Sequence, residues 1–376
     1  MKTHLPNWCK LLHMNLPGKI ILLLCLGLTF QSYGQETPGI KLTKKPAAGA
    51  CCEDKNCCAG KETPPGIMTG HIHRAGEWMI SYNYMAMLMK GNRTGTSKTS
   101  DAEIYNTYMM APETMNMQMH MLMLMYGITD RLTVMAMGGY NFYRMDMNMQ
   151  AMVMNGMNMP ASAMHCTSSG LADTRVYGLY NFSRKEQYEL IGSLALSLPT
   201  GSVSCTGTTM LGNNQRVAYG MQSGTGSVSI LPGVSFIRQY EKLALGTEAV
   251  ADIKLNNNTA GYRFGNEYHA NVWAGYRFLN FMGGSLRAEG VQADNISGSD
   301  KVISIPINEQ YDPTMNSKNY GGTRCTVYAG LTFHVKKQFK ERIRIQLEAG
   351  VPVYENLNGP QMSQQANILA GVQYKF

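Results

Sequence analysis

Seven methionines between residues 145 and 159 are the side chains whose type and spacing most strongly suggest chemistry. They are Met145, Met147, Met149, Met152, Met154, Met157 and Met159, in a stretch that the sequence predicts to be a long loop. Thioether sulfur favours soft ions such as Cu(I) or Ag(I), and Met-x-Met spacing puts two sulfurs on one side of an extended chain. The alternative is an adaptable apolar lining that folds into the mouth of a pore. The sequence leaves both interpretations open.

A second set of methionines occupies every other position from Met115 to Met125. In a β-strand these side chains share one face, while Asn116, Gln118 and His120 share the opposite face. The pattern favours methionines against lipid and the three polar side chains in the lumen of a barrel, where they would contact cargo. The alternative points the methionines inward as a ladder of soft ligands.

Cysteine pairs add further soft ligands near the N-terminus, as Cys51-Cys52 and Cys57-Cys58, and His71 and His73 follow them. These residues could hold a soft metal ion, although their spacing differs from the C-x2-C pairs of zinc sites. In an exported chain two disulfides are the competing interpretation. The sequence implies no cofactor other than a possible Cu(I) or similar soft ion.

The composition narrows the class of protein. The chain has 376 residues, of which 44% are hydrophobic and 15% charged, with a formal net charge of +8. This charged fraction lies well below the roughly 25% of soluble domains. No apolar run beyond the N-terminus approaches the roughly 18 residues of a membrane helix, and apolar residues recur with period two. These features indicate an all-β protein, and the absence of a basic cluster gives no indication of nucleic-acid binding.

Three regions follow from the pattern along the chain. Residues 1–34 combine basic residues with the apolar run Ile20 to Phe30 and predict a cleavable signal peptide. Residues 35–77 contain scattered Pro, Gly and Lys without period-two alternation, and predict a flexible periplasmic arm. Residues 78–376 are expected to form the membrane domain.

The membrane domain divides into about twelve alternating segments near the roughly 9–11 residue length of a membrane strand. They are 78–89, 115–126, 132–143, 171–182, 188–198, 227–238, 243–254, 267–278, 282–292, 324–335, 342–352 and 364–376. Short and long connections alternate between them. We therefore predict a transmembrane antiparallel β-barrel of about 12 strands, with short periplasmic turns and long extracellular loops, in a Gram-negative outer membrane.

The last segment supports this prediction, because Ile368, Val372, Tyr374 and Phe376 share one apolar face. A lone terminal aromatic residue on that face resembles the signal that the bacterial barrel-assembly machinery reads. Aromatic residues at other strand ends would form the girdles found at membrane interfaces. The expected partners are therefore outer-membrane lipid and the barrel-assembly machinery.

Several stretches resemble the outer-membrane barrel family of the MetA pathway of phenol degradation, which is related to fatty-acid channels. They are Gly66-Ile67-Met68-Thr69-Gly70-His71-Ile72-His73, Ser169-Gly170-Leu171-Ala172-Asp173, Leu198-Pro199-Thr200-Gly201, Ser223-Gly224-Thr225 and Leu231-Pro232-Gly233. The resemblance extends from residue 66 to about residue 300 and implies a passive channel for small hydrophobic or aromatic compounds. The cysteine pairs have no counterpart in that pattern.

Catalysis finds no support in the motifs. The sequence contains no P-loop, no Gly-x-Ser-x-Gly and no His-Glu-x-x-His, so we do not expect an enzyme. His269 and His334 lie on predicted strands and are expected to face the lumen as polar residues. The predicted function is a channel for small solutes, with small hydrophobic compounds or soft metal ions as cargo. The alternative is a metal-sequestering protein in which the barrel is only an anchor.

Overall fold

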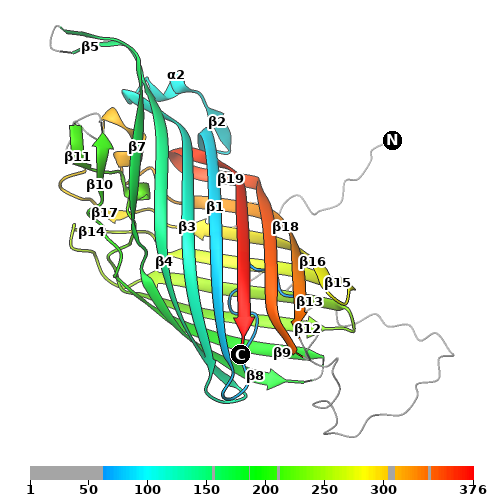
Figure 1. Cartoon of the computed structure of the whole chain (residues 1–376). Helices are drawn as coiled ribbons and strands as arrows, with labels where there is room; N and C mark the ends of the chain where they lie inside the picture. The colour runs from blue at the N-terminus through cyan, green and yellow to red at the C-terminus, as the bar shows by residue number, and fades with distance from the viewer. Residues whose placement is uncertain (1–61, 155–156, 186, 210–211, 304–309, 338–339) are drawn as a thin grey trace, which may run out of the picture. The chain divides into compact units, whose positions relative to one another are not determined.

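The computed structural model describes residues 62–376 with the exception of 155–156, 186, 210–211, 304–309 and 338–339. The predicted signal peptide and the cysteine pairs at 51–58 lie outside the described residues. Antiparallel strands make up most of the described chain (Figure 1). In that part of the chain, no helix is both long and apolar enough to cross a membrane.

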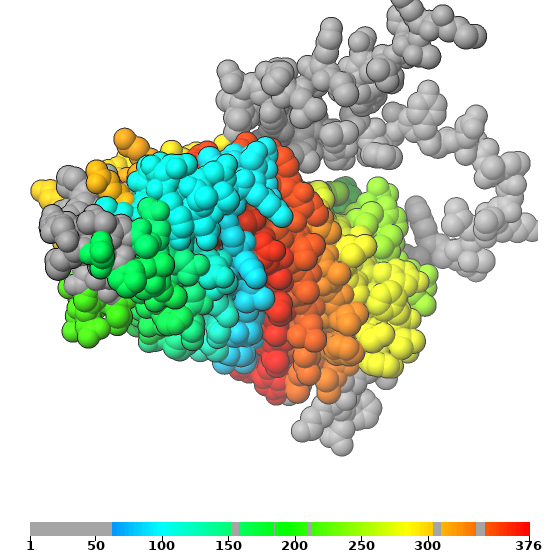
Figure 2. All heavy atoms as spheres, turned by 90° about the horizontal axis from the view of Figure 1, so that it is seen from above, coloured from blue at the N-terminus to red at the C-terminus, as the bar shows by residue number. Residues whose placement is uncertain are grey.

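Within the described residues, eleven strand elements form the closed wall. In order around the ring they are β1 (Trp78–Gly95), β3 (Met110–Gly127), β4 (Leu132–Met149), β8 (Thr174–Arg184), β9 (Tyr188–Leu198), β12 (Ser229–Gln239), β13 (Leu243–Lys254), β15 (Glu267–Leu279), β16 (Met282–Ala293), β18 (Gly322–Lys337) and β19 (Lys340–Lys375). Each pairs antiparallel with the next, and β19 pairs with β1 to close the ring. Figure 2 shows the blue first strand and the red last strand side by side.

The last element, β19, crosses the wall twice. It has 36 residues, twice the 18 of β1, and its first part pairs with β18 while its second part pairs with β1. A closed ring whose neighbours are all antiparallel needs an even number of passes, so β19 must reverse direction. The reversal lies at Gly359, whose φ is +75°, and the amide of Gln364 beyond it donates to the Glu355 carboxylate at 3.2 Å. Twelve passes result, which confirms the predicted number of about 12.

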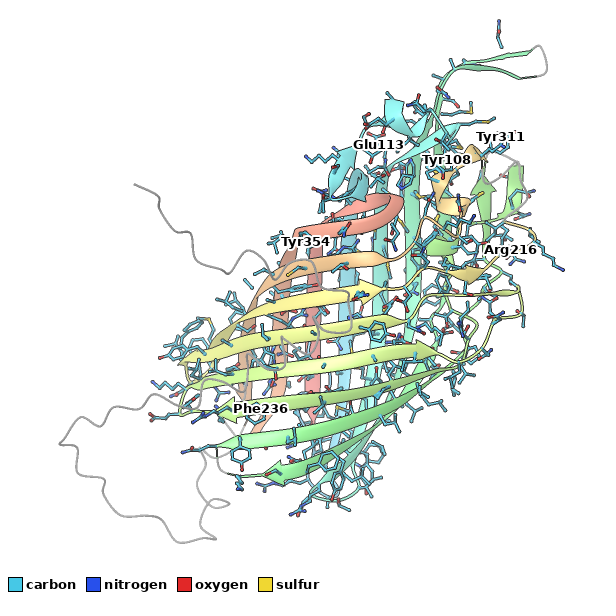
Figure 3. All side chains as sticks on the ribbon, turned by 180° about the vertical axis from the view of Figure 1, so that it is seen from behind. Tyr108, Glu113, Arg216, Phe236, Tyr311 and Tyr354 are labelled. Carbon is cyan, nitrogen blue, oxygen red and sulfur yellow. The ribbon has the colours of Figure 1, made fainter. Side chains whose placement is uncertain are left out.

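Smaller elements lie at the end of the barrel that carries the long connections. They are β2 (Ser97–Thr99), α2 (Asp101–Ile104), β5 (Met152–Met154), β6 (Met157–Met159), β7 (Ser162–Leu171), β10 (Thr206–Thr209), β11 (Gly212–Arg216), η3 (Tyr219–Met221), β14 (Tyr262–Arg263), β17 (Ser297–Gly298) and η4 (Pro313–Met315). Tyr108, Arg216 and Tyr311 lie among them (Figure 3). At the opposite end, the connections among the described residues are short turns, such as residues 128–131 between β3 and β4. The predicted sorting of short and long connections is thus confirmed.

Side chains alternate strictly between the two faces of the wall. On β3, Leu122 is 55% exposed and Leu124 is 41% exposed, whereas Met123 and Met125 between them are buried. The exposed set elsewhere is apolar or aromatic, including Phe236, Leu286 and Val351. An apolar outer face suits lipid, and closure of the sheet leaves no open edge in the hydrocarbon. The predicted transmembrane β-barrel is the fold observed.

Candidate functional site: the two walls of the lumen

The inward faces of β1, β3 and β4 form a continuous surface that we call the methionine wall. Strand pairing places Met79 beside Met125 and Met125 beside Met135 near the short turns. Further along the lumen the same register pairs Met85 with Met119. The favoured interpretation of the 115–125 ladder, with methionines against lipid, is therefore wrong, and the inward alternative is correct.

Asn116, Gln118 and His120 accordingly lie on the outer face of β3 and do not line the lumen. His120 pairs across the sheet with Tyr84, and its Nδ1 lies 2.7 Å from the Tyr82 hydroxyl. The physical reason is that the same face continues into Leu122 and Leu124, which lipid solvates. The polar residues lie on the side away from the short turns, where the apolar band gives way to the aromatic girdle.

The methionines predicted to lie in a loop divide into two groups. Met145, Met147 and Met149 extend β4, point inward and are buried. Met152, Met154, Met157 and Met159 form the small β5–β6 hairpin, in which Met152 pairs with Met159 and Met154 with Met157. The loop prediction was thus wrong for the first group, because alternation with polar residues continues a strand as readily as it fills a loop.

The three inward methionines of β4 belong to a larger sulfur-rich cluster near the end with the long loops. The buried members of this cluster are Met110, Met115, Tyr143, Met145, Met147, Met149, Cys166, Cys205, Val217, Met221 and Met362, with Met89, Met109, Met117 and Met164 packed against them. Cys166 and Cys205 are free thiols. Among the described residues, no three His, Cys, Asp or Glu side chains converge as a metal site. Any metal site in this region would therefore depend on thioether sulfur.

The opposite side of the lumen is a charged wall, formed by the inward faces of β13, β15, β16, β18 and the first pass of β19. Arg287 donates two hydrogen bonds to the Glu348 carboxylate, at 3.0 and 2.9 Å, and one to the Asn271 side-chain oxygen at 2.9 Å. Asn271 donates in turn to Glu248 at 3.2 Å. The Arg287 guanidinium also lies 3.7 Å from the centre of the Tyr328 ring. Bidentate pairing and ring stacking together fix this arginine in one orientation.

Sequence reasoning missed the charged wall. Glu248, Arg287 and Glu348 each lie in a segment that was predicted as a strand. Each occupies a position of the two-residue alternation that is buried in the lumen. A charged residue at an inward position is a signal for lumen chemistry.

Residues 62–77 lie between the two walls instead of forming a free arm. The Glu62 carboxylate accepts from Arg277 at 2.7 Å and lies 2.8 Å from His334 Nε2, and the Gln346 amide donates to the Thr63 carbonyl at 3.0 Å. Ile67 packs among the buried methionines. His334 thus faces the lumen as expected. Of the predicted arm at 35–77, the described part is packed inside the barrel, and we call it the lumen segment.

Glycine makes this close approach possible. A Cβ on Gly275 of β15 would lie 2.0 Å from the Glu62 carbonyl oxygen, and one on Gly66 would lie 2.4 Å from an Arg287 nitrogen. Only residues without a side chain let the two backbones come this near. The lumen segment and the wall are therefore matched to each other.

The candidate ligands His71 and His73 lie on the lumen segment, with ring centroids 5.3 Å apart in an edge-to-face arrangement. The His73 amide donates to the Thr133 hydroxyl at 2.8 Å, near the start of β4. Burial lowers the pKa of His73 to about 4, so its ring is neutral at pH 7. No described cysteine lies beside these rings, and the four cysteines at 51–58 are outside the described residues.

Three of the motifs that carried the family resemblance meet at Asp173. Its carboxylate accepts from the Gly201 amide at 2.9 Å and from the Thr225 amide at 2.8 Å. A Cβ on Gly201 would lie 2.5 Å from the backbone of Gly224. The Asp173 carboxylate thus ties the long connection after β9 to the start of β8, which is a structural role.

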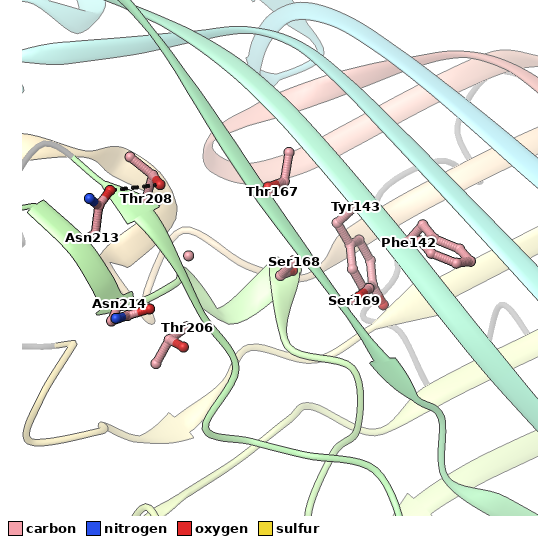
Figure 4. A pocket seen from close by; sticks show the side chains of 10 residues that line it. Phe142, Tyr143, Thr167, Ser168, Ser169, Thr206, Thr208, Asn213 and Asn214 are labelled. Atoms are coloured by element: carbon pink, nitrogen blue, oxygen red, sulfur yellow. Dashed lines mark hydrogen bonds between the residues drawn. The ribbon is translucent and has the colours of Figure 1, made fainter.

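A cleft of about 790 Å³ opens along β7 toward the β10–β11 hairpin (Figure 4). Its lining contains hydroxyl and amide side chains, among them Thr167, Ser168 and Asn214. Thr208 donates to the Asn213 side-chain oxygen at 3.1 Å across the hairpin. Tyr143 belongs both to the lining of the cleft and to the sulfur-rich cluster, but the lining contains no sulfur.

Comparison with known proteins agrees with this architecture. Residues 126–302 match the family described as "Putative MetA-pathway of phenol degradation", which confirms the predicted resemblance. An outer membrane channel from Pseudomonas putida is 13% identical with a TM-score of 0.52, covering 84% of this chain and 100% of that one. The transport unit of an Escherichia coli autotransporter is 10% identical with a TM-score of 0.44, covering 82% and 93%. No curated protein matches the sequence.

Proposed function

We propose that this chain, whose residues 126–302 match the phenol-degradation MetA-pathway family, is an outer-membrane channel for small apolar or aromatic solutes. The observation that carries the proposal is the methionine wall, which extends from Met125 and Met135 near the short turns to Met149 near the long loops. Thioethers are polarisable, adapt their shape and contact aromatic rings favourably. The Pseudomonas putida relative is described as an outer membrane channel, which supports the same class of function.

The lumen segment defines where such a channel narrows. It contacts both walls at the end with the short turns, through Ile67 on the methionine side and Glu62 on the charged side. Solutes that enter among the long loops therefore meet this segment before they leave. We infer that movement of residues 62–77 controls passage.

A matched pair of solutes tests the proposal. Phenyl glucoside and methyl glucoside share the same sugar and differ only in the attached group, which is a phenyl ring in one and a methyl group in the other. The sugar keeps both solutes from crossing a lipid bilayer that contains no protein. We expect proteoliposomes containing the full chain to swell in both solutes. After correction for molecular size, phenyl glucoside should enter faster than methyl glucoside. Absence of swelling in either solute would refute a channel, while equal permeability after size correction would refute the aromatic preference.

A soft metal ion is the second candidate cargo, favoured by the sulfur-rich cluster. A barrel that only sequesters metal is the related alternative. Transport and sequestration predict different solute flux, because a protein that only sequesters metal should leave liposomes closed to solutes while it still binds Ag(I). Swelling with methyl glucoside together with Ag(I) binding would favour transport over storage.

Export and assembly belong to the same proposal. We infer that residues 1–34 are a cleavable signal peptide and that the barrel-assembly machinery recognises the final strand. Phe376 supports this inference, because its side chain is exposed on the outer face and its amide donates to the Trp78 carbonyl at 3.0 Å. Deletion of Phe376 should reduce the amount of folded protein in the outer membrane, measured by heat-modifiable gel mobility.

A further inference from the structure

Four sulfur-bearing side chains stand in one row across four strands. Strand pairing places Met89 of β1 opposite Met115 of β3, Met115 opposite Met145 of β4, and Met145 opposite Cys166 of β7. Directly paired residues on one face have Cβ atoms about 4.5–5.5 Å apart. Side chains at this spacing can direct the sulfurs of two neighbours in the row toward a point between them, whereas the ends of the row lie too far apart to do so. We call these residues the sulfur row.

The row faces inward, and its members are buried except Met89, which is partly buried. Cys166 is 3% exposed and Met145 is 2% exposed, and both belong to the sulfur-rich cluster. The next pair along the same strands adds another thioether contact, because Met147 pairs with Met164. Soft donors are therefore concentrated at this level of the lumen.

Packing alone does not account for methionine at these positions. The outward face of the same strands uses Ile80, Leu88, Leu122 and Leu124, and no methionine of β1, β3 or β4 faces outward along their shared pairing. Leucine and isoleucine would fill an apolar lumen equally well, with less conformational freedom to lose than methionine. The choice of sulfur on one face only points to a requirement for sulfur.

The carboxylate that follows Met145 in the sequence points away from the row. Asp146 follows Met145 but lies on the other face of β4, where it accepts from the Thr114 hydroxyl at 2.8 Å and lies 2.5 Å from His165 Nδ1. A thiol and a thioether favour soft monovalent ions over Mg²⁺ or Ca²⁺, which prefer oxygen ligands.

We propose that the sulfur row binds one soft monovalent ion, Cu(I) or Ag(I), between the thiolate of Cys166 and the thioether of Met145, which stand directly opposite each other. On binding, a sulfur–metal bond forms at Cys166, the S–H bond breaks, and the proton passes to solvent, so no oxidant or reductant is needed. This site deepens the soft-metal candidate above and rests on it, but it does not require that the pore conduct.

The test is Ag(I) binding to the full chain, folded in detergent and free of chloride, measured by isothermal titration. All proteins compared carry serine at Cys51, Cys52, Cys57, Cys58, Cys205 and Cys325, so that Cys166 is the one thiol of the exported chain that can bind Ag(I). We expect one tight site that Cys166→Ser and Met145→Leu each weaken by about tenfold or more.

The matched controls are Met125→Leu and Met135→Leu, the same substitution on the same wall near the short turns. They should leave Ag(I) affinity unchanged, and heat-modifiable gel mobility should show that every variant is folded. If Met145→Leu binds like its parent, or if the controls lose affinity equally, the sulfur row is not the site. If Cys166→Ser does not fold, Met145→Leu tests the same site without altering a thiol.

Channel failure and site failure are separable. Entry of methyl glucoside into liposomes is measured with the parent chain, and Ag(I) binding is measured with the parent and the row variants. Closed liposomes combined with Ag(I) binding that depends on the row would refute the channel and leave the site intact. Open liposomes combined with row-independent binding would refute the site alone.

Discussion

The methionine wall and the charged wall are built by the same alternation, yet they stabilise the barrel in different ways. On β3, Met121 and Met123 pack through flexible side chains that no hydrogen bond orients. On β16, Arg287 is held by Glu348, Asn271 and the Tyr328 ring at once. Dispersion contacts tolerate small displacements, whereas a buried ion pair does not. The first wall can therefore adapt to a cargo, while the second fixes the lumen segment in place.

Removal of Arg287 should break the charged wall and give the largest effect. Arg287→Met leaves Glu348 buried without its cation, a loss that typically costs about 3–5 kcal/mol. Urea unfolding in lipid vesicles, followed by tryptophan fluorescence, measures the change. Arg287→Lys is the control, which should lose less because it keeps the charge without the bidentate geometry. If Arg287→Met were as stable as the parent, the ion pair would not hold this wall together.

A side chain at Gly275 should separate the lumen segment from the wall. Gly275→Val places atoms where the Glu62 carbonyl lies, and overpacking of this kind costs about 1–3 kcal/mol. We expect faster entry of methyl glucoside and easier proteolysis within residues 62–77. Gly138→Val is the control, because a Cβ there meets nothing within 4 Å. Unchanged flux with a released segment would show that the segment does not restrict the lumen.

These residues also show how far the sequence reaches. The alternation along twelve segments, including 115–126, was enough to predict the strands and the number of passes, and separate motifs carried the family resemblance. It could not say which face of the ladder is inward, because methionine suits lipid and lumen alike and the polar face ends in Leu122 and Leu124. That assignment depends on the closed sheet, since inward faces must agree all around the ring.

The lumen segment was beyond sequence reasoning for a different reason. Residues 62–77 have no periodicity, because they pair with no strand and are positioned by side chains far along the chain. Glu62 and His334 are 272 residues apart. Only the folded barrel brings Glu62 to Arg277 and Gly275, so a segment rich in Pro and Gly resembles a flexible arm until the wall is known.

Acid should loosen the methionine side of the lumen segment through His73. Its pKa is lowered by burial and by Lys375 and Arg344, which outweigh Glu77, to about 4 from an ordinary 6.5. Between pH 6.5 and pH 4, His73 therefore binds a proton in the unfolded chain but stays neutral in the folded chain. Stability is complete above pH 6.5 and falls as pH drops toward 4, by about 2 kcal/mol at pH 5.

Urea unfolding at pH 7.5 and pH 5 measures this change, and His73→Leu removes the titrating ring. The variant should lose less stability than the parent over that interval. An equal loss in both proteins would assign the acid sensitivity to other groups, such as the carboxylates of the charged wall.

The smallest effect should come from the methionine wall itself. Met123→Leu nearly conserves volume, removes no hydrogen bond and should cost less than about 1.5 kcal/mol. The same change should reduce the preference for phenyl glucoside over methyl glucoside, because the thioether contact with the ring is lost. Met123 pairs with Met137 on β4, so Met137→Leu should act in the same direction, and the double variant shows whether the two sulfurs act together. Leu122→Met on the outer face of the same strand is the matched control, since it adds a sulfur where only lipid can contact it. If Leu122→Met alters the ring preference as strongly as Met123→Leu, the preference does not arise in the lumen, and the contrast between an adaptable wall and a fixed one loses its functional meaning.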